Sequence, residues 1–165
     1  MSDELNWMPA VELAQRIRDR EVSPVEATEA ALAQLEAVEP AINAFVTVTA
    51  DLARDTARQA ERAVMTTPAD ELGLLHGVPV SVKDLTDTAG VRTTYGARPF
   101  RDNVPDTDGV AWARMKAAGA VLIGKTTTPE FGMLGFTESQ LTGRTSTPWD
   151  PAMISGGSSG GAAAR

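Results

Sequence analysis

The chain has 165 residues, 42% of them hydrophobic and 22% charged, which fits one globular domain of ordinary size rather than a disordered segment. Its 15 basic and 22 acidic residues give a net charge of −7, which argues against a nucleic-acid-binding or anionic-membrane surface. No run of residues is long and apolar enough to cross a membrane, and the acidic N-terminus is not a signal peptide. With no cysteine and one histidine, the sequence predicts no disulfide, no zinc site and no cofactor, and it favours a cytoplasmic location.

Residues 1–73 are predicted to form an N-terminal helical segment. Apolar residues recur at helical spacing in 8–22. A second helix is expected to begin after Ser23, because this N-cap residue is followed by Pro24 and, three positions after the cap, by a glutamate. Pro40 is expected to end this helix. A short strand over residues 44–49 and a polar-faced helix from Asp51 follow.

Residues 74–165 are predicted to form the first part of an α/β core. A short apolar strand over 77–84, a helix over 107–120 and a β-branched strand over 120–124 follow one another. This order predicts a mixed, largely parallel sheet covered by helices. Residues 125–150 are rich in glycine and proline and are expected to form loops, and the alanines at 162–164 are expected to open a helix.

One motif in this core has a misleading form. Gly119 to Thr126 match the nucleotide-binding P-loop pattern letter for letter. However, the four residues between the two glycines are Ala, Val, Leu and Ile, which indicate a buried strand rather than a loop whose N–H groups surround a phosphate. Pro129 also argues against a helix directly after the motif. The sequence therefore does not predict nucleotide binding.

Lys83 is the best candidate for a base in a chain with so little histidine. By strand alternation it lies on the face opposite Val78 and Val82. A lysine at a strand end is often simply solvated, but a partly desolvated lysine loses proton affinity and can act as a neutral base. The one histidine, His76, precedes the strand, where a structural or exposed role is expected.

The stretch Ser155–Gly161, SGGSSGG, allows two interpretations. Such a string is typical of a flexible linker. Alternatively, its glycines allow a backbone geometry that holds one serine in a defined place. Serine and lysine together form a recognised nucleophile–base pairing, so the second interpretation connects this stretch with Lys83.

Three stretches together resemble the amidase signature hydrolases: residues 77–97, 115–132 and 146–164. Their order and approximate separations match the family, as does the distance of 75 positions between Lys83 and Ser158. The helical region before residue 74 also resembles the family's N-terminal segment. The resemblance implies the amidase signature α/β fold.

The resemblance also implies roles for individual residues. Lys83 matches the catalytic lysine, and Ser158 matches a bridging serine that the family holds with a cis peptide bond. Neutral Lys83 would take a proton from Ser158, which would take one from a second, nucleophilic serine that attacks a carboxamide. The loop around Gly132 and Met133 resembles the border of the acyl pocket and is expected to bind substrate.

The sequence departs from the family pattern at its C-terminal end. The family's nucleophile lies in a GGS loop about two dozen residues after the bridging serine. The same loop also forms the oxyanion hole. This chain has seven residues after Ser158. We expect it to be the N-terminal portion of a longer enzyme, inactive alone, although a truncated, inactive gene product is the alternative. Ser155 also stands where the family often has proline.

Three functions from different classes are compatible with these features. The leading one is an amidohydrolase that acts on a small-molecule amide, with the remainder of the amidase chain as its structural partner. The second is the glutamine-hydrolysing subunit of a tRNA-dependent amidotransferase. The third is a non-enzymatic helical interaction module, which explains the first third of the chain but not Lys83 together with Ser158. Neither nucleic acid nor membrane is expected as a partner, and a homodimer is left open.

Overall fold

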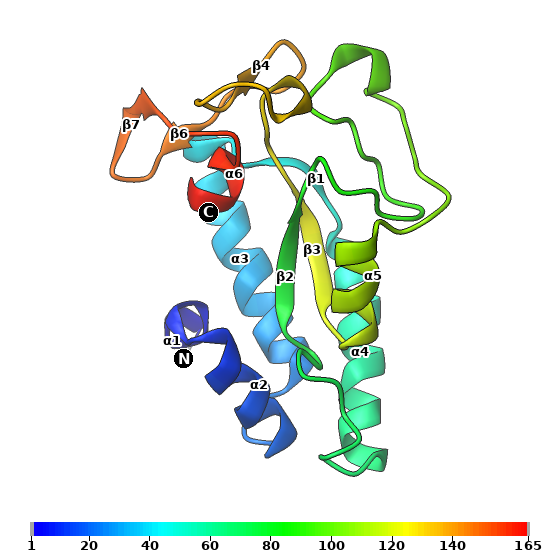
Figure 1. The fold of residues 1–165 in the computed structure, drawn as a ribbon. Coiled ribbons are helices and arrows are strands. Elements are labelled where there is room, and N and C mark those ends of the chain that lie inside the picture. Colours follow the sequence, from blue (N-terminus) through cyan, green and yellow to red (C-terminus); the bar gives the residue numbers. More distant parts are fainter. Residues whose placement is uncertain (1, 165) are drawn as a thin grey trace. The chain divides into compact units, whose positions relative to one another are not determined.

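The computed structural model describes residues 2–164 (Figure 1). Helices dominate the first 66 residues, and strands, turns and short helices follow. In chain order the elements are α1 (Ser2–Trp7), α2 (Ala10–Arg18), α3 (Pro24–Ile42), β1 (Phe45–Val48), α4 (Ala50–Thr66), β2 (Pro79–Lys83), η1 (Arg98–Phe100), α5 (Val110–Ala117), β3 (Val121–Thr126), η2 (Glu130–Gly132), β4 (Glu138–Ser139), β5 (Gly143–Arg144), β6 (Ser146–Thr147), β7 (Asp150–Ile154) and α6 (Gly160–Ala164).

The chain folds into two compact units, and each draws on several separate segments. The first unit comprises the chain through Gln34 together with Thr49–Val80 and Ala113–Ile123. The second comprises Leu35–Val48, Ser81–Trp112 and the chain from Gly124 onward. The predicted boundary between residues 73 and 74 divides the chain in sequence order, unlike these two discontinuous units. It stays a prediction about where the α/β core begins.

The first unit is built around a core of aliphatic side chains from its helices and from the turns that follow α2 and precede β2. The N-cap at the start of α3 is as predicted, because Ser23 Oγ accepts hydrogen bonds from the backbone N–H groups of Val25 (3.0 Å) and Glu26 (3.4 Å). His76 Nε2 lies 2.9 Å from the carbonyl oxygen of Ala60, which gives this histidine a structural contact, as expected. The core residues are Leu13, Ala14, Ile17, Val22, Ala27, Val64 and Val78.

The end of α3 differs from the prediction, because the helix continues past Pro40 to Ile42. A proline removes one helical hydrogen bond, and in the last turn few further bonds depend on it. The helix stops at Asn43, which adopts a positive φ of 54° and still donates its N–H to the Glu39 carbonyl oxygen (2.8 Å). The Glu39 carboxylate then accepts the next two backbone N–H groups at 3.0 and 2.9 Å, which directs the chain into β1.

A three-stranded sheet with the order β1-β3-β2 carries the site described below. β1 and β3 are antiparallel. β2 and β3 run in the same direction, because Val121 N–H donates to the Val78 carbonyl oxygen (2.9 Å) and Asp84 N–H donates to that of Thr126 (3.1 Å). Every residue of β3 is buried, as its β-branched composition predicts. The predicted α/β class with a mixed sheet is confirmed.

Residues 125–150 are more regular than predicted, since they contain short paired strands. β4 pairs with β5, and β6 pairs with β7, both antiparallel. Three backbone hydrogen bonds join these hairpins. Thr145 N–H donates to the carbonyl oxygen of Thr137 (3.0 Å), and Thr137 N–H donates to that of Ser155 (3.0 Å). Ser155 N–H in turn donates to the carbonyl oxygen of Thr145 (2.8 Å). β4, β5 and β6 have two residues each, too few for an alternating pattern, and β7 has a proline at its second position, which argues against a strand. Helix α6, beside β6 in Figure 1, contains the alanines that predict it but begins two residues earlier, at Gly160.

Candidate active site

Lys83 is the last residue of β2, at the point where the strand leaves the sheet. Its side chain is half-buried. Burial lowers the pKa of the Lys83 ammonium from its ordinary value of 10.5, because removal from water disfavours the charged form. The strand end therefore presents an amine that loses its proton more easily than a free lysine does.

The Lys83 side chain reaches two neighbouring serines of the SGGSSGG stretch. Its Nζ donates to Ser158 Oγ at 2.7 Å and to Ser159 Oγ at 2.9 Å. The two residues that the sequence indicates as catalytic candidates, 75 positions apart, are thus in direct contact. The second contact, with Ser159, was not predicted. The only sequence signal for it is that its hydroxyl is adjacent to that of Ser158.

The backbone of the serine stretch is held in place on both sides, unlike a free linker. Gly157 N–H donates to the carbonyl oxygen of Gly135 at 2.8 Å, and Gly156 forms an isolated β-bridge with Phe136. A side chain at Gly157 would put its Cβ 2.7 Å from the backbone nitrogen of Phe136, so only glycine allows this approach. The peptide bond between Gly157 and Ser158 is cis, as the family resemblance implies.

The two glycines after the serines fit the start of α6 tightly against its neighbours. Gly160 N–H donates to Thr137 Oγ1 at 3.0 Å, and a Cβ at Gly160 would lie 2.1 Å from that same oxygen. A Cβ at Gly161 would lie 2.5 Å from the carbonyl oxygen of Ala44. These close contacts explain why SGGSSGG needs glycine after its serines as well as before them.

The predicted substrate-binding residues differ in their exposure to solvent. Gly132 has a φ of +69°, and a Cβ there would be 2.8 Å from Leu85 Cδ1 and 3.5 Å from Ser158 Oγ. It is thus a direct neighbour of the serine that Lys83 contacts. The side chain of Met133, by contrast, is 79% exposed. Both roles in substrate binding stay predictions.

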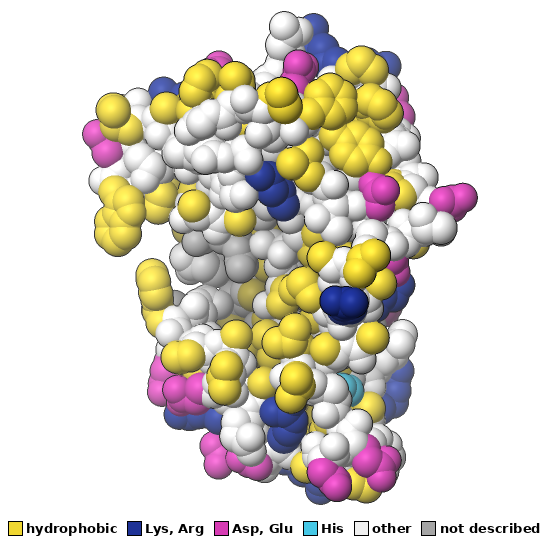
Figure 2. Space-filling view, in the orientation of Figure 1, with side chains coloured by type: hydrophobic (Ala, Val, Ile, Leu, Met, Phe, Trp, Pro, Cys, Tyr) yellow, Lys and Arg dark blue, Asp and Glu magenta, His cyan; other side chains and the backbone are white. Residues whose placement is uncertain are grey.

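An apolar surface lies around Gly132. Tyr95 and Phe100 meet edge to face with ring centroids 5.2 Å apart, and Phe100 meets Phe131 in the same way at 6.0 Å. Figure 2 shows hydrophobic side chains gathered over loops of the second unit. We define the exposed members of this group as the apolar rim: Phe100, Phe131, Met133, Leu134 and Phe136.

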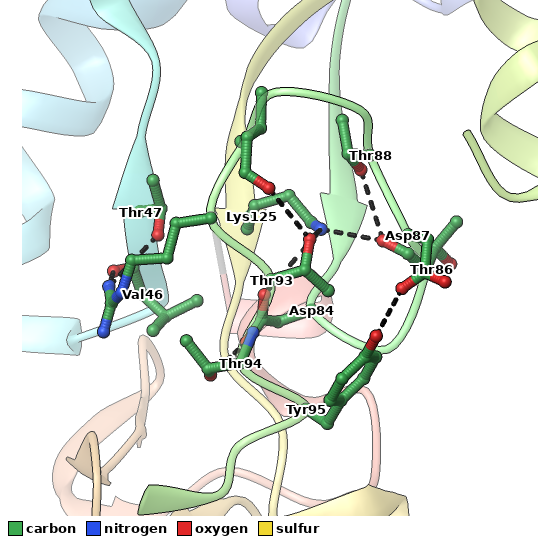
Figure 3. A network of polar contacts seen from close by, with 12 residues as sticks. Val46, Thr47, Asp84, Thr86, Asp87, Thr88, Thr93, Thr94, Tyr95 and Lys125 are labelled. Carbon is green, nitrogen blue, oxygen red and sulfur yellow. Dashed lines mark hydrogen bonds and ion pairs between the residues drawn. The ribbon is translucent and has the colours of Figure 1, made fainter. Parts of the chain in front are cut away.

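A buried polar network follows directly after Lys83 in the chain (Figure 3). At its centre is Lys125, the lysine of the P-loop-like string, which is fully buried at the end of β3. Its Nζ donates to the carbonyl oxygen of Thr86 (2.7 Å) and to Thr93 Oγ1 (2.6 Å), and it lies 3.8 Å from Asp84 Oδ1. The string is a strand, as predicted. The network itself was not predicted, because its members lie up to 41 positions apart (84 to 125).

Burial dominates the electrostatics of this network. It lowers the pKa of the Lys125 ammonium to about 8, although the carboxylates of Asp84 and Asp87 oppose that shift. Burial also raises the pKa of the Asp84 carboxyl, although the hydrogen bonds from Thr94 and the charge of Lys125 act to lower that pKa. Each member of the pair is therefore held by hydrogen bonds to the threonines around it, Lys125 by Thr86 and Thr93 and Asp84 by Thr94, while burial of the two charges carries a desolvation cost.

Within residues 2–164, no helix is long and apolar enough to cross a membrane. The same part of the chain contains no group of three or more histidine or acidic side chains arranged to hold a metal ion.

Comparisons with known proteins agree with this geometry. The chain is 48% identical to a glutamyl-tRNA(Gln) amidotransferase subunit of Geotalea daltonii, over 98% of this chain and 33% of that protein. It is 41% identical to an acylamidase of Rhodococcus erythropolis, over 97% of this chain and 33% of that protein. Among solved structures, a bacterial aryl acylamidase of the amidase signature family superposes with a TM-score of 0.89 at 32% identity, over 96% of this chain and 33% of that one.

The chain thus spans about a third of the length of the relatives that it matches. The profile of the family described as Amidase matches residues 26–165, which include Lys83, Gly132 and Ser158. The predicted amidase signature fold is confirmed by the structural match, and the chain belongs to the Amidase family.

Proposed function

We propose that the protein is an amidohydrolase that cleaves a carboxamide by acyl transfer, with Lys83 as the base and Ser158 as the proton relay. The observation that carries this proposal is the 2.7 Å contact between Lys83 Nζ and Ser158 Oγ. This distance permits direct proton transfer in either direction. The lowered pKa of Lys83 supports the same role, since a base must be neutral to accept a proton.

In the proposed reaction, neutral Lys83 accepts the hydroxyl proton of Ser158, and Ser158 accepts the proton of a nucleophilic serine. The oxygen of that serine attacks the carbonyl carbon, the C–N bond breaks, and the relay returns a proton to the departing nitrogen. Water then attacks the acyl-enzyme and releases the carboxylic acid. In this proposal the nucleophile and the oxyanion donors come, as the family resemblance implies, from a GGS loop of the intact protein.

The surroundings of Ser158 favour an amide with an apolar acyl group. Gly132 lies directly beside Ser158 Oγ, and the apolar rim begins at its neighbours Phe131 and Met133. Apolar side chains near a reacting carbonyl bind hydrocarbon groups by removing them from water. We therefore place Gly132 and Met133 at the acyl side of the substrate.

The experiment is a hydrolysis assay of the full-length protein with a panel of carboxamides that range from small polar amides to anilides of fatty and aromatic acids. We expect release of amine or ammonia, an acyl adduct visible by intact-protein mass spectrometry, and loss of both in Lys83→Ala. Lys116→Ala is the matched control, because Lys116 is an exposed lysine in α5. Full activity of Lys83→Ala would refute the proposal.

A second candidate is the amidase-type subunit of a glutamyl-tRNA(Gln) amidotransferase. Its support is the 48% identity with the amidotransferase subunit of Geotalea daltonii. The same lysine–serine relay would then act on glutamine, and the ammonia would pass to a partner protein. The assay separates the two candidates: the amidotransferase subunit would hydrolyse glutamine in preference to anilides, and it would copurify with its partners when expressed in its native host.

A further inference from the structure

Lys125 is a buried cation that the proposed proton relay does not use. It is fully buried in β3, and its ammonium makes two short hydrogen bonds, to the carbonyl oxygen of Thr86 and to Thr93 Oγ1. Burying a lysine is costly, and the space it fills could hold an apolar side chain instead. These two acceptors and the Asp84 carboxylate, 3.8 Å from the ammonium, all belong to the loop that follows β2 (Figure 3). The cation therefore ties the central strand to that loop.

The loop begins directly after Lys83, at Asp84, whose backbone and Oδ2 are hydrogen-bonded. Asp84 donates its N–H to the Thr126 carbonyl oxygen (3.1 Å), and its own carbonyl oxygen accepts the N–H of Tyr95 (3.0 Å). Its carboxylate accepts the backbone N–H of Thr94 (3.0 Å) and also the hydroxyl of that residue. These bonds determine where β2 ends, and hence the position from which the Lys83 side chain starts.

The far end of the same loop supports the segment next to Ser158. The carbonyl oxygen of Tyr95 accepts the N–H of Phe131 at 2.8 Å. A Cβ at Gly96 would lie 2.6 Å from the carbonyl oxygen of Thr128, so the loop and the chain before η2 are in close contact. Gly132, one residue after Phe131, adjoins Ser158 Oγ. One loop therefore connects the base to the residue beside its relay.

We propose that Lys125 is a positioning residue for amide hydrolysis: its ammonium clamps the loop of residues 84–95, and this loop sets Lys83 and Gly132 against Ser158. The inference rests on the proposed function, because it assumes that Lys83 and Ser158 transfer protons. Proton transfer is sensitive to small displacements, so loosening this loop lowers the rate even when every reacting group remains.

The test is Lys125→Met in the full-length protein, which keeps the approximate volume and removes the charge. We expect kcat/KM to fall about 100-fold, mainly through kcat. We also expect the acidic limb of the pH profile to move up by about one pH unit, because a displaced Lys83 is better hydrated. The charged groups that face the Lys125 ammonium are Asp84 and Asp87, and neither is among the causes of the Lys83 pKa shift. A moved acidic limb therefore reports a change in the hydration of Lys83.

Thr126→Val is the matched control. This neighbouring side chain is also fully buried, and its Oγ1 has no hydrogen-bond partner among residues 2–164. We expect its kcat/KM and its pH profile to match the wild type. If Lys125→Met does not fold, Thr93→Val decides the question, because it removes one acceptor of the ammonium with little change in volume. Its kcat/KM is expected to fall about 10-fold.

The two proposals fail in different ways. If folded Lys125→Met keeps kcat/KM within threefold of the wild type while Lys83→Ala is inactive, the positioning role is refuted and the proposed function stands. The same holds if the activity of Lys125→Met falls only in proportion to its folded fraction, with an unmoved acidic limb. If Lys83→Ala retains activity, the proposed function itself is refuted.

Discussion

The proton affinity of Lys83 depends on burial, because no charged neighbour among residues 2–164 contributes to the shift of its pKa. Desolvation lowers this pKa below 10.5, so the neutral fraction at any given pH is larger than for a free lysine. We expect kcat/KM of the full-length protein to rise with pH through an apparent pKa below 10.5, as Lys83 loses its proton. A pH profile from 5 to 11 measures this limb. A midpoint at or above the ordinary lysine value would contradict the assignment.

Two adjacent serines contact Lys83, but the proposed relay uses one of them. Ser158 Oγ is the nearer, at 2.7 Å, and its side chain is half-buried, whereas Ser159 is exposed. We expect Ser158→Ala to lower kcat about 1,000-fold and Ser159→Ala less than 10-fold, because the latter removes only a hydrogen bond to the amine. Steady-state kinetics of the two variants decide between them, each serving as the other's control. Equal losses would assign the relay to both hydroxyls.

At the level of elements, η2 adjoins the relay through a glycine with a left-handed backbone. Gly132 combines a φ of +69° with close approach to Leu85 and Ser158, so Gly132→Ala strains the backbone and crowds the site. We expect kcat/KM to fall at least 10-fold with a modest loss of stability. Gly135→Ala is the control, since a Cβ there meets nothing within 4 Å. Wild-type kinetics in Gly132→Ala, measured on the same substrate, would exclude η2 from the acyl side.

The sequence predicted those elements whose signals are local. The Ser23 cap, the apolar run of β3 and the alanines of α6 each show within a few residues. The length of α3 and the two hairpins were not predicted. In α3 the left-handed Asn43, rather than Pro40, ends the helix, and the hairpins depend on backbone bonds between distant segments.

The candidate site was predictable only in part, for a related reason. Lys83 and Ser158 were paired through the family resemblance, since no local pattern connects positions 75 residues apart. The contact of Ser159 depends on the exact path of the backbone after Gly157. The buried Lys125 lies inside a string that composition identifies as a strand, but composition does not say which loop its side chain reaches.

For the whole molecule, the proposed reaction assigns the nucleophile, as the family resemblance implies, to a serine outside the segment that matches a third of the relatives' length. We expect the purified 165-residue chain to release no ammonia or amine from an amide that the full-length protein hydrolyses, because in the proposed reaction it supplies the base and the relay but not the nucleophile. Parallel assays at equal molar concentration measure this. The control is the full-length protein carried through the same purification. Turnover by the short chain would show that a group within it attacks the amide.

The hairpin of β6 and β7 has a spectroscopic consequence. Of the three tryptophans, Trp112 is 5% exposed, whereas Trp149, between the two strands, is 94% exposed. An indole in water emits at longer wavelength than one in an apolar environment, so the hairpin reports on what covers it. With Trp7 and Trp112 replaced by phenylalanine, the emission of the 165-residue chain comes from Trp149, and in the full-length protein the difference between spectra with and without Trp149→Phe isolates the same indole. A blue shift between the short chain and the full-length protein then identifies this hairpin as a surface that the rest of the protein buries.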